Sequence, residues 1–181
     1  MRIIGGLWRG RRLRFSPANG LRPTADRVRE TLFNWLAPEI NGARCLDLFA
    51  GSGALGLEAL SRGAGHCDFV DVSAEAMRTI QSHLAALGAI ERAGCHTASA
   101  QDMLRAGAEQ YDIVFVDPPF GQGLAGPACD LLDRQHRLAP GALVYLETGT
   151  DEALPELPAT WVEHRDKRAG GVSYRLFRTA G

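Results

Sequence analysis

The chain has 181 residues, of which 45% are apolar and 23% charged, a composition typical of one globular domain with a sizeable core. Its apolar runs are shorter than the roughly 20 residues that a membrane span requires, and the first residues lack the apolar region of a secretory signal. The four cysteines show no Cys-x-x-Cys spacing, which favours reduced thiols over a disulfide scaffold or zinc site. We therefore expect a cytoplasmic monomer without membrane contact or bound metal.

Charge is distributed unevenly along the chain. Residues 1–29 hold eight arginines against one acid, whereas residues 30–160 hold seven arginines against eighteen acids. Such asymmetry suggests that a polyanion contacts the N-terminal end. A solvated basic arm is the alternative, but Trp8 and Phe15 in the same segment could stack on bases. We predict an arm over residues 1–23 for nucleic-acid contact, followed by a domain over 24–181. The predicted contacts are Arg2, Trp8, Arg9, Arg11, Arg12, Arg22 and Arg27.

The N-terminal third begins with glycine-rich and helical patterns. Residues 2–4 and 11–15 predict a strand pair joined through glycines, which would form a β-hairpin extension. A helix is predicted to begin after Thr24, which can cap it, and to end before Pro38.

From residue 44 onward, apolar runs alternate with helical stretches. This alternation indicates a parallel sheet that is covered on both faces. The tail differs, because no helix separates its last two strands, and it predicts a closing antiparallel hairpin over 160–165 and 172–178. The other predicted strands cover 44–49, 67–72, 95–98, 113–116 and 142–146. The predicted helices between them cover 54–61, 74–87, 101–107 and 124–137.

A glycine-rich loop follows the first of these strands. Residues 51–56 are Gly-Ser-Gly-Ala-Leu-Gly between a strand and a helix, and Asp71 ends the next strand. Glycines let the backbone approach a nucleotide-like ligand, and an acid at that position accepts hydrogen bonds from ribose hydroxyls. The loop therefore predicts a nucleoside cofactor. Its predicted contacts are Asp47, Phe49, Ala50, Gly51, Ser52, Gly53 and Asp71.

Asp47 bears on which cofactor is bound. A carboxylate four residues before the first glycine would repel the pyrophosphate of a dinucleotide. The same carboxylate could accept a hydrogen bond from the amino group of a methionine moiety, directly or through water. Asp47 therefore favours S-adenosylmethionine, although a role limited to capping the loop backbone stays open.

A second motif follows the run 113–116 and consists of Asp117-Pro118-Pro119-Phe120. Open α/β sheets bind ligands beyond the carboxyl ends of their strands, so this motif should face the same crevice as the glycine loop. The prolines stiffen the turn and offer no amide hydrogen, which leaves the Asp117 carboxylate and the Pro118 carbonyl as acceptors beside Phe120. This arrangement suits a planar base with an exocyclic amine. A rigid turn with a core phenylalanine is the alternative.

These motifs resemble those of a known family. The tetrapeptide resembles the (Asp/Asn)-Pro-Pro-(Phe/Tyr) signature of methyltransferases that act on amino nitrogens, and residues 46–53 resemble their cofactor loop. Over essentially the whole chain the sequence is similar to the RsmD family, which methylates N2 of one guanine in 16S ribosomal RNA. The segments that carry this similarity include 2–6, 8–11, 21–24, 26–36, 53–62 and 174–176.

The resemblance implies a class I S-adenosylmethionine-dependent methyltransferase fold, which is α/β and Rossmann-like, with a seven-stranded, mostly parallel sheet and helices on both faces. It also implies S-adenosylmethionine as donor and the small ribosomal subunit, or a late assembly intermediate, as partner. Two positions depart from the usual pattern. Asp71 stands where the family often has glutamate, and the adenine edge is assigned to Ala100 and Gln101, where many methyltransferases place an acid or asparagine earlier.

The implied catalytic residues are Asp117, Pro118, Pro119 and Phe120, and Asp117 is also counted as a tenth cofactor-binding residue. Asp117 and the Pro118 carbonyl would accept the amine hydrogens and direct the nitrogen lone pair toward the methyl group, while Phe120 stacks on the base. Adenine-N6 methyltransferases share the Asp-Pro-Pro signature, so the tetrapeptide alone does not select guanine. An NAD-dependent oxidoreductase and a noncatalytic RNA-binding protein are the remaining alternatives.

Overall fold

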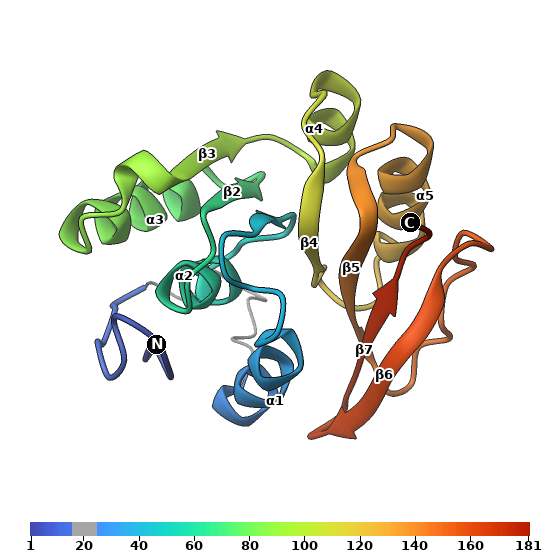
Figure 1. Cartoon of the computed structure of the whole chain (residues 1–181), viewed down its shortest axis with the longest axis horizontal. Coiled ribbons are helices and arrows are strands. Elements are labelled where there is room, and N and C mark those ends of the chain that lie inside the picture. Colours follow the sequence, from blue (N-terminus) through green and yellow to red (C-terminus); the bar gives the residue numbers. More distant parts are fainter. Residues whose placement is uncertain (16–24) are drawn as a thin grey trace.

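A computed structural model of the protein describes residues 1–15 and 25–181 (Figure 1). Within these residues, one seven-stranded sheet has the strand order β3-β2-β1-β4-β5-β7-β6. The strands are β1 (Arg44–Asp47), β2 (His66–Asp71), β3 (Ala93–Thr97), β4 (Tyr111–Val116), β5 (Leu138–Gly149), β6 (Val162–Ala169) and β7 (Val172–Arg178). The helices are α1 (Asp26–Leu36), α2 (Ala54–Ser61), α3 (Ala74–Ala86), α4 (Ala100–Ala106) and α5 (Ala125–Arg134), with a 3-10 turn at Ile90–Arg92.

Six strands of the sheet, β1 to β6, run in the same direction, and β7 runs antiparallel to them. β1 lies between β2 and β4, and β3 and β5 continue the parallel arrangement on either side of these three strands. β7 returns antiparallel between β5 and β6, because a short turn can only join antiparallel strands. The carboxyl ends of β1 to β5 therefore lie at one edge of the sheet. This arrangement confirms the predicted mostly parallel α/β sheet and its closing hairpin.

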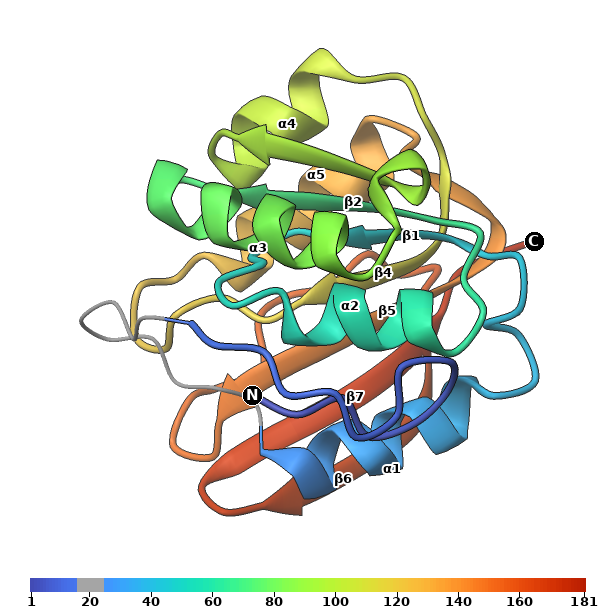
Figure 2. The ribbon, with the colours of Figure 1, turned by 90° about the vertical axis from the view of Figure 1, so that its left-hand side faces the viewer.

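Side-chain alternation separates two apolar layers, one on each face of the sheet. Helices α1, α2 and α3 cover one face, and α4 and α5 cover the other, as Figure 2 shows. In β4, Ile113 and Phe115 point into the α1–α3 layer, whereas Val114 points into the α4–α5 layer. No helix in the described part of the chain is long and apolar enough to cross a membrane.

Strand β5 extends beyond the predicted 142–146 at both ends. Its pairing with β4 shifts register between Tyr111 and Ile113, so residues 139–142 lie opposite a single residue of β4. This irregular stretch contains Pro140, which has no amide to donate to a sheet ladder. The shift lets the strand resume regular pairing and reach Gly149, three residues past the predicted end.

Helix α5 ends three residues before the predicted 124–137. His136 has a left-handed φ of 52°, which ends helical geometry. Arg137 is fully buried, and its guanidinium donates hydrogen bonds to the carbonyls of Met103, Leu104 and Glu109. The chain thus leaves the helix in order to place this side chain beneath the end of α4.

Residues 1–15 pair over a shorter stretch than the predicted strand pair and contain no regular strand. Arg2 and Arg12 form an antiparallel bridge, and the amides of Ile3 and Leu13 donate to the carbonyls of Arg11 and Met1. The loop between the paired residues binds α2. The Ile4 amide donates to the Glu58 carboxylate at 2.9 Å, and the Leu7 amide donates to the Ser61 carbonyl at 2.8 Å. In place of the expected β-hairpin extension with two strands, the segment is a short antiparallel pairing whose loop is docked on a helix, and we call it the docked loop.

The docked loop belongs to the same core as the rest of the chain. Ile3, Trp8 and Leu13 are buried in the α1–α3 layer. Gly6 has φ 78°, and its backbone lies so close to α2 that a Cβ atom there would come within 2.0 Å of the Ser61 carbonyl oxygen. The predicted boundary at residues 23–24 and the predicted Thr24 cap both lie outside the described residues.

Candidate active site

A cavity of about 890 Å³ opens at the carboxyl ends of the parallel strands. One end, which we call the glycine-loop half, is bounded by Gly51 and Asp71. The other end, the motif half, is bounded by Asp117 and Phe120. Nine of the ten predicted cofactor-binding residues line this cavity, together with all four predicted catalytic residues; Gly53 does not line it. The two motifs that the sequence singled out thus face one space.

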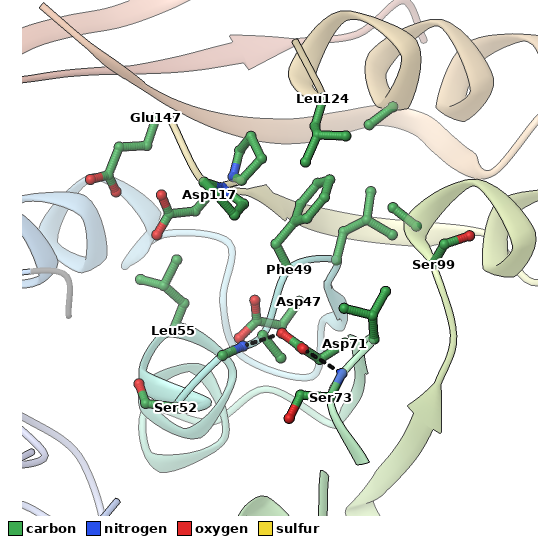
Figure 3. Close-up of a pocket in the computed structure, with 18 of the residues that line it drawn as sticks. Asp47, Phe49, Ser52, Leu55, Asp71, Ser73, Ser99, Asp117, Leu124 and Glu147 are labelled. Carbon is green, nitrogen blue, oxygen red and sulfur yellow. Dashed lines mark hydrogen bonds between the residues drawn. The ribbon is translucent and has the colours of Figure 1, made fainter. Parts of the chain in front are cut away.

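The glycine loop is held in place by the acid that ends β2. Asp71 accepts hydrogen bonds from the amides of Gly51 and Ser73, both at 2.9 Å (Figure 3). Gly53 has φ 79°, and a Cβ atom there would lie 2.9 Å from Ile80 of α3, so this position requires glycine. Asp71 therefore acts as a tether for the loop while its side chain remains at the cavity wall.

Asp47 combines burial with a backbone contact. Its carboxylate is 1% exposed and accepts a hydrogen bond from the Gly56 amide at 3.0 Å. Burial is the main cause that raises the pKa of Asp47 to about 7, and the nearby Asp71 charge adds to it, while the Gly56 amide opposes it. The backbone-capping role is present in the structure, and Asp47 also lines the cavity, so both roles that the sequence suggested are open to it.

The cavity continues between β2 and α4. Ala100 and Gln101 line it at the beginning of α4, whose preceding residue Ser99 accepts a hydrogen bond from the Asp102 amide. Val72 also lines the cavity, and its side chain is 73% exposed, which is unusual for a large apolar residue. This region offers an open apolar surface beside polar groups, a setting that suits a flat ring with polar edges.

The motif half is built on the end of β4. Pro118 is buried, Pro119 is exposed and Phe120 is half-buried against the α1–α3 layer. Glu152, in the segment after β5, holds the loop that follows Phe120. Its carboxylate accepts hydrogen bonds from the Gly121 amide and, at 3.0 Å, from the Gly149 amide. Glu152 therefore joins the loop that follows the motif to the end of β5.

Several lining residues were not predicted. The most notable is Glu147, whose carboxylate points into the motif half near Asp117 (Figure 3). The signal for it is an acid that directly follows a buried run, the same signal that Asp71 and Asp117 give. Phe15 also lines the cavity, which brings the N-terminal segment to its edge. The other unpredicted lining residues are Leu48, Ala54, Leu55, Val72, Ser73, Ala98, Ser99, Gln122, Leu124 and Ala128.

The predicted nucleic-acid contacts divide into exposed and buried side chains. Exposed positions hold Arg2, Arg9, Arg11, Arg12 and Arg27. Arg22 lies outside the described residues.

The prediction that Trp8 stacks on bases is corrected by its burial. The side chain is only 7% exposed and packs in the α1–α3 layer, where the Arg92 guanidinium covers its ring at 5.9 Å. An indole in that position serves the core and has no free face for a base. Among the described residues, no group of three or more histidine, cysteine or acidic side chains could hold a metal ion.

Comparisons with known proteins cover nearly the whole chain. Residues 1–178 match the protein-family model described as "Conserved hypothetical protein 95". The chain is 49% identical over 178 residues to ribosomal RNA small subunit methyltransferase D of Escherichia coli strain K12, which covers 98% of this chain and 89% of that protein. It is 45% identical over 181 residues to the Haemophilus influenzae protein of the same name, covering 98% and 93%. The solved structure of yhhF from Escherichia coli is similar with a TM-score of 0.92 at 46% identity, covering 99% and 98%.

Proposed function

This chain belongs to the RsmD family of small-subunit ribosomal RNA methyltransferases, and from that premise we propose that it transfers a methyl group from S-adenosylmethionine to the exocyclic N2 of one guanine in 16S ribosomal RNA. The substrate in this proposal is the small subunit or a late assembly intermediate, and the protein acts as a cytoplasmic monomer. The observation that carries the proposal is the opening of the glycine loop and the Asp117–Phe120 motif into a single cavity.

The glycine-loop half fits S-adenosylmethionine. Each oxygen of Asp71 accepts one backbone amide and keeps lone pairs that can accept from ribose hydroxyls. The exposed side chain of Val72 offers an apolar face to the purine, and Asp47 is placed to accept from the amino group of the methionine moiety. When bound, S-adenosylmethionine supplies an electrophilic methyl group on a positively charged sulfur.

The motif half fits an amine-bearing base. The N2 lone pair of guanine is delocalised into the ring, so the nitrogen is a poor nucleophile. Asp117 and the Pro118 carbonyl accept the amine hydrogens, which allows the nitrogen to pyramidalise and aim its lone pair at the methyl group. Phe120 stacks on the base once it has left the RNA stack, a contact worth about 1–3 kcal/mol. After transfer, Asp117 or solvent takes the proton that the nitrogen loses.

In this proposal, the exposed arginines of the docked loop form the surface that binds RNA. Arg9, Arg11 and Arg12 lie on the same segment as Phe15, which reaches the cavity edge. Guanidinium groups there neutralise phosphates around the target nucleotide and hold the RNA over the cavity. The segment does this as a rigid part of the body, because its apolar side chains are anchored in the core.

The test is methyl transfer to small subunits that lack the modification. Subunits from cells without the protein are incubated with the protein and labelled S-adenosylmethionine, and the modified nucleotide is mapped. We expect one N2-methylguanine in 16S ribosomal RNA. Subunits from wild-type cells should accept no methyl group, because their target is already methylated. N6-methyladenine as product would replace the proposal with the adenine alternative. RNA binding without transfer, or stabilisation by NADH and not by S-adenosylhomocysteine, would exclude a methyltransferase.

A further inference from the structure

The motif half contains two carboxylates on neighbouring strands. Val116 of β4 pairs with Leu146 of β5, so Asp117 and Glu147, the next residues along each strand, are cross-strand neighbours. Both follow the alternation that places Phe115 and Tyr145 in the α1–α3 layer, so they project to the same side of the sheet. Figure 3 shows both carboxylates at one end of the cavity, which both residues line.

Glu147 is oriented by a buried phenol. Its side chain is 4% exposed, and Oε2 accepts a hydrogen bond from the Tyr145 hydroxyl at 3.0 Å. Burial, together with the charges of Glu147 and Asp117, raises the pKa of Tyr145 well above its ordinary value, so its hydroxyl stays a donor. Tyr174 of β7 pairs opposite Glu147 and packs near the Tyr145 ring, with ring centroids 6.5 Å apart. The Glu147 carboxylate is therefore held in place beside two packed tyrosine rings.

Guanine and adenine differ in what they present to this pair of carboxylates. The Watson–Crick edge of guanine carries two adjacent donors, the N1–H and the N2 amine. Adenine presents a bare N1 acceptor beside its amine. A buried carboxylate that faces a bare ring nitrogen leaves two acceptors opposed and unpaired, which is costly in a desolvated site.

Resting on the proposed methyl transfer to guanine N2, we infer that Glu147 is a specificity-determining residue that accepts the N1–H of the target guanine. Asp117 and the Pro118 carbonyl then accept from the N2 amine alone, and Tyr145 is the positioning residue for Glu147. The motif itself recognises only an exocyclic amine, which guanine and adenine both carry. The contact of Glu147 with the N1–H is then what selects guanine over adenine.

The experiment separates the N1–H from the reacting amine. 2-Aminopurine keeps the amine at position 2 and lacks the N1–H. Small subunits are reconstituted with 16S ribosomal RNA that carries guanine or 2-aminopurine at the mapped target, and single-turnover methylation is measured on each. Wild type should prefer guanine. In Glu147→Gln the amide can rotate and present its NH2 group to the bare N1, so the preference for guanine should fall by about tenfold or more.

Controls make the outcome decisive. Glu156→Gln changes an exposed carboxylate outside the cavity and should keep the wild-type preference. Tyr145→Phe removes the hydrogen bond to Glu147 and should also lower the preference for guanine over 2-aminopurine, by a smaller factor than Glu147→Gln. If Glu147→Gln fails to bind S-adenosylhomocysteine, Tyr145→Phe serves as the test variant in its place. An unchanged preference, or an equal loss on both bases, overturns the role of Glu147. Wild type that methylates no guanine N2 contradicts the proposed function itself, and this inference with it.

Discussion

The two halves of the cavity use carboxylates in different ways. In the glycine-loop half, Asp71 and Asp47 accept hydrogen bonds from three backbone amides, so these acids hold the main chain as well as the cavity wall. In the motif half, Asp117 precedes two prolines that have no amide to donate, and Glu147 is oriented by the side chain of Tyr145. In the glycine-loop half the carboxylates therefore also stabilise the main chain. In the motif half the neighbouring residues direct the carboxylates toward the cavity.

This difference predicts how substitutions separate. A change in the glycine-loop half should alter cofactor affinity and loop structure together, because one carboxylate serves both. A change in the motif half should alter turnover and base choice and leave cofactor affinity intact.

Replacing Asp117 should have the largest effect on turnover. Asp117→Ala removes an acceptor for the amine in the transition state, and single-turnover methylation should fall by about 100-fold or more. Asp117→Asn keeps one acceptor and should be less severe. S-adenosylmethionine affinity, measured by calorimetry, should remain that of wild type in both variants. Near-normal methylation by the alanine variant would remove Asp117 from the mechanism, and a parallel loss of cofactor affinity would erase the distinction between the halves.

Replacing Asp71 should weaken cofactor binding. Asp71→Ala loses the ribose contact and releases the amides of Gly51 and Ser73, which together should cost about 1.5–3 kcal/mol of S-adenosylmethionine binding energy. Calorimetry measures this loss directly. Asp151→Ala, which changes an exposed acid outside the cavity, should bind like wild type. Equal affinity of Asp71→Ala and wild type would refute the ribose assignment.

Substitution of the exposed arginines in the docked loop should weaken RNA binding and leave cofactor affinity unchanged. The triple variant Arg9→Ala, Arg11→Ala and Arg12→Ala should bind small subunits more weakly. The slope of log affinity against log salt should flatten by about 0.7–0.9 for each lost phosphate contact. Arg105→Ala, an exposed arginine on α4, is the matched control. A salt slope like that of wild type in the triple variant would locate the RNA surface elsewhere.

Point substitutions are needed here because the segment cannot simply be deleted. Removing residues 1–15 would take Ile3, Trp8 and Leu13 out of the α1–α3 layer and expose the core beneath them. The resulting loss of folding would obscure any effect on RNA.

The smallest expected effect concerns the pH dependence of stability. Burial raises the pKa of Asp47 to about 7, so the folded state holds this proton more tightly than the unfolded chain does. The corresponding stability is present at low pH and is lost as pH rises from about 4 to about 7. Asp47→Asn does not titrate, so its free energy of unfolding relative to wild type should rise over that range by at least about 1 kcal/mol. Urea unfolding of both proteins without cofactor measures the difference, and a constant difference across the range would contradict the assignment.

The sequence by itself determined the architecture and half of the residues that line the cavity. Strands β1 to β4 and both strands of the closing hairpin lie within a few residues of their predicted places, because side-chain periodicity and turn residues act over short distances. Asp71 and Asp117 could be found in the same way, since each ends a buried run in a sheet whose carboxyl ends share one edge.

Only the tertiary structure decided what lies beside these residues. Glu147 becomes a neighbour of Asp117 through the pairing of β4 with β5, which joins residues thirty positions apart in the sequence. The N-terminal segment packs on α2 as well as pairing with itself, because the Ile4 amide donates to the buried Glu58 carboxylate 54 residues away. That contact brings Trp8 into the core and leaves the arginines exposed. A local pattern cannot predict such outcomes, because the partners meet only after the chain has folded.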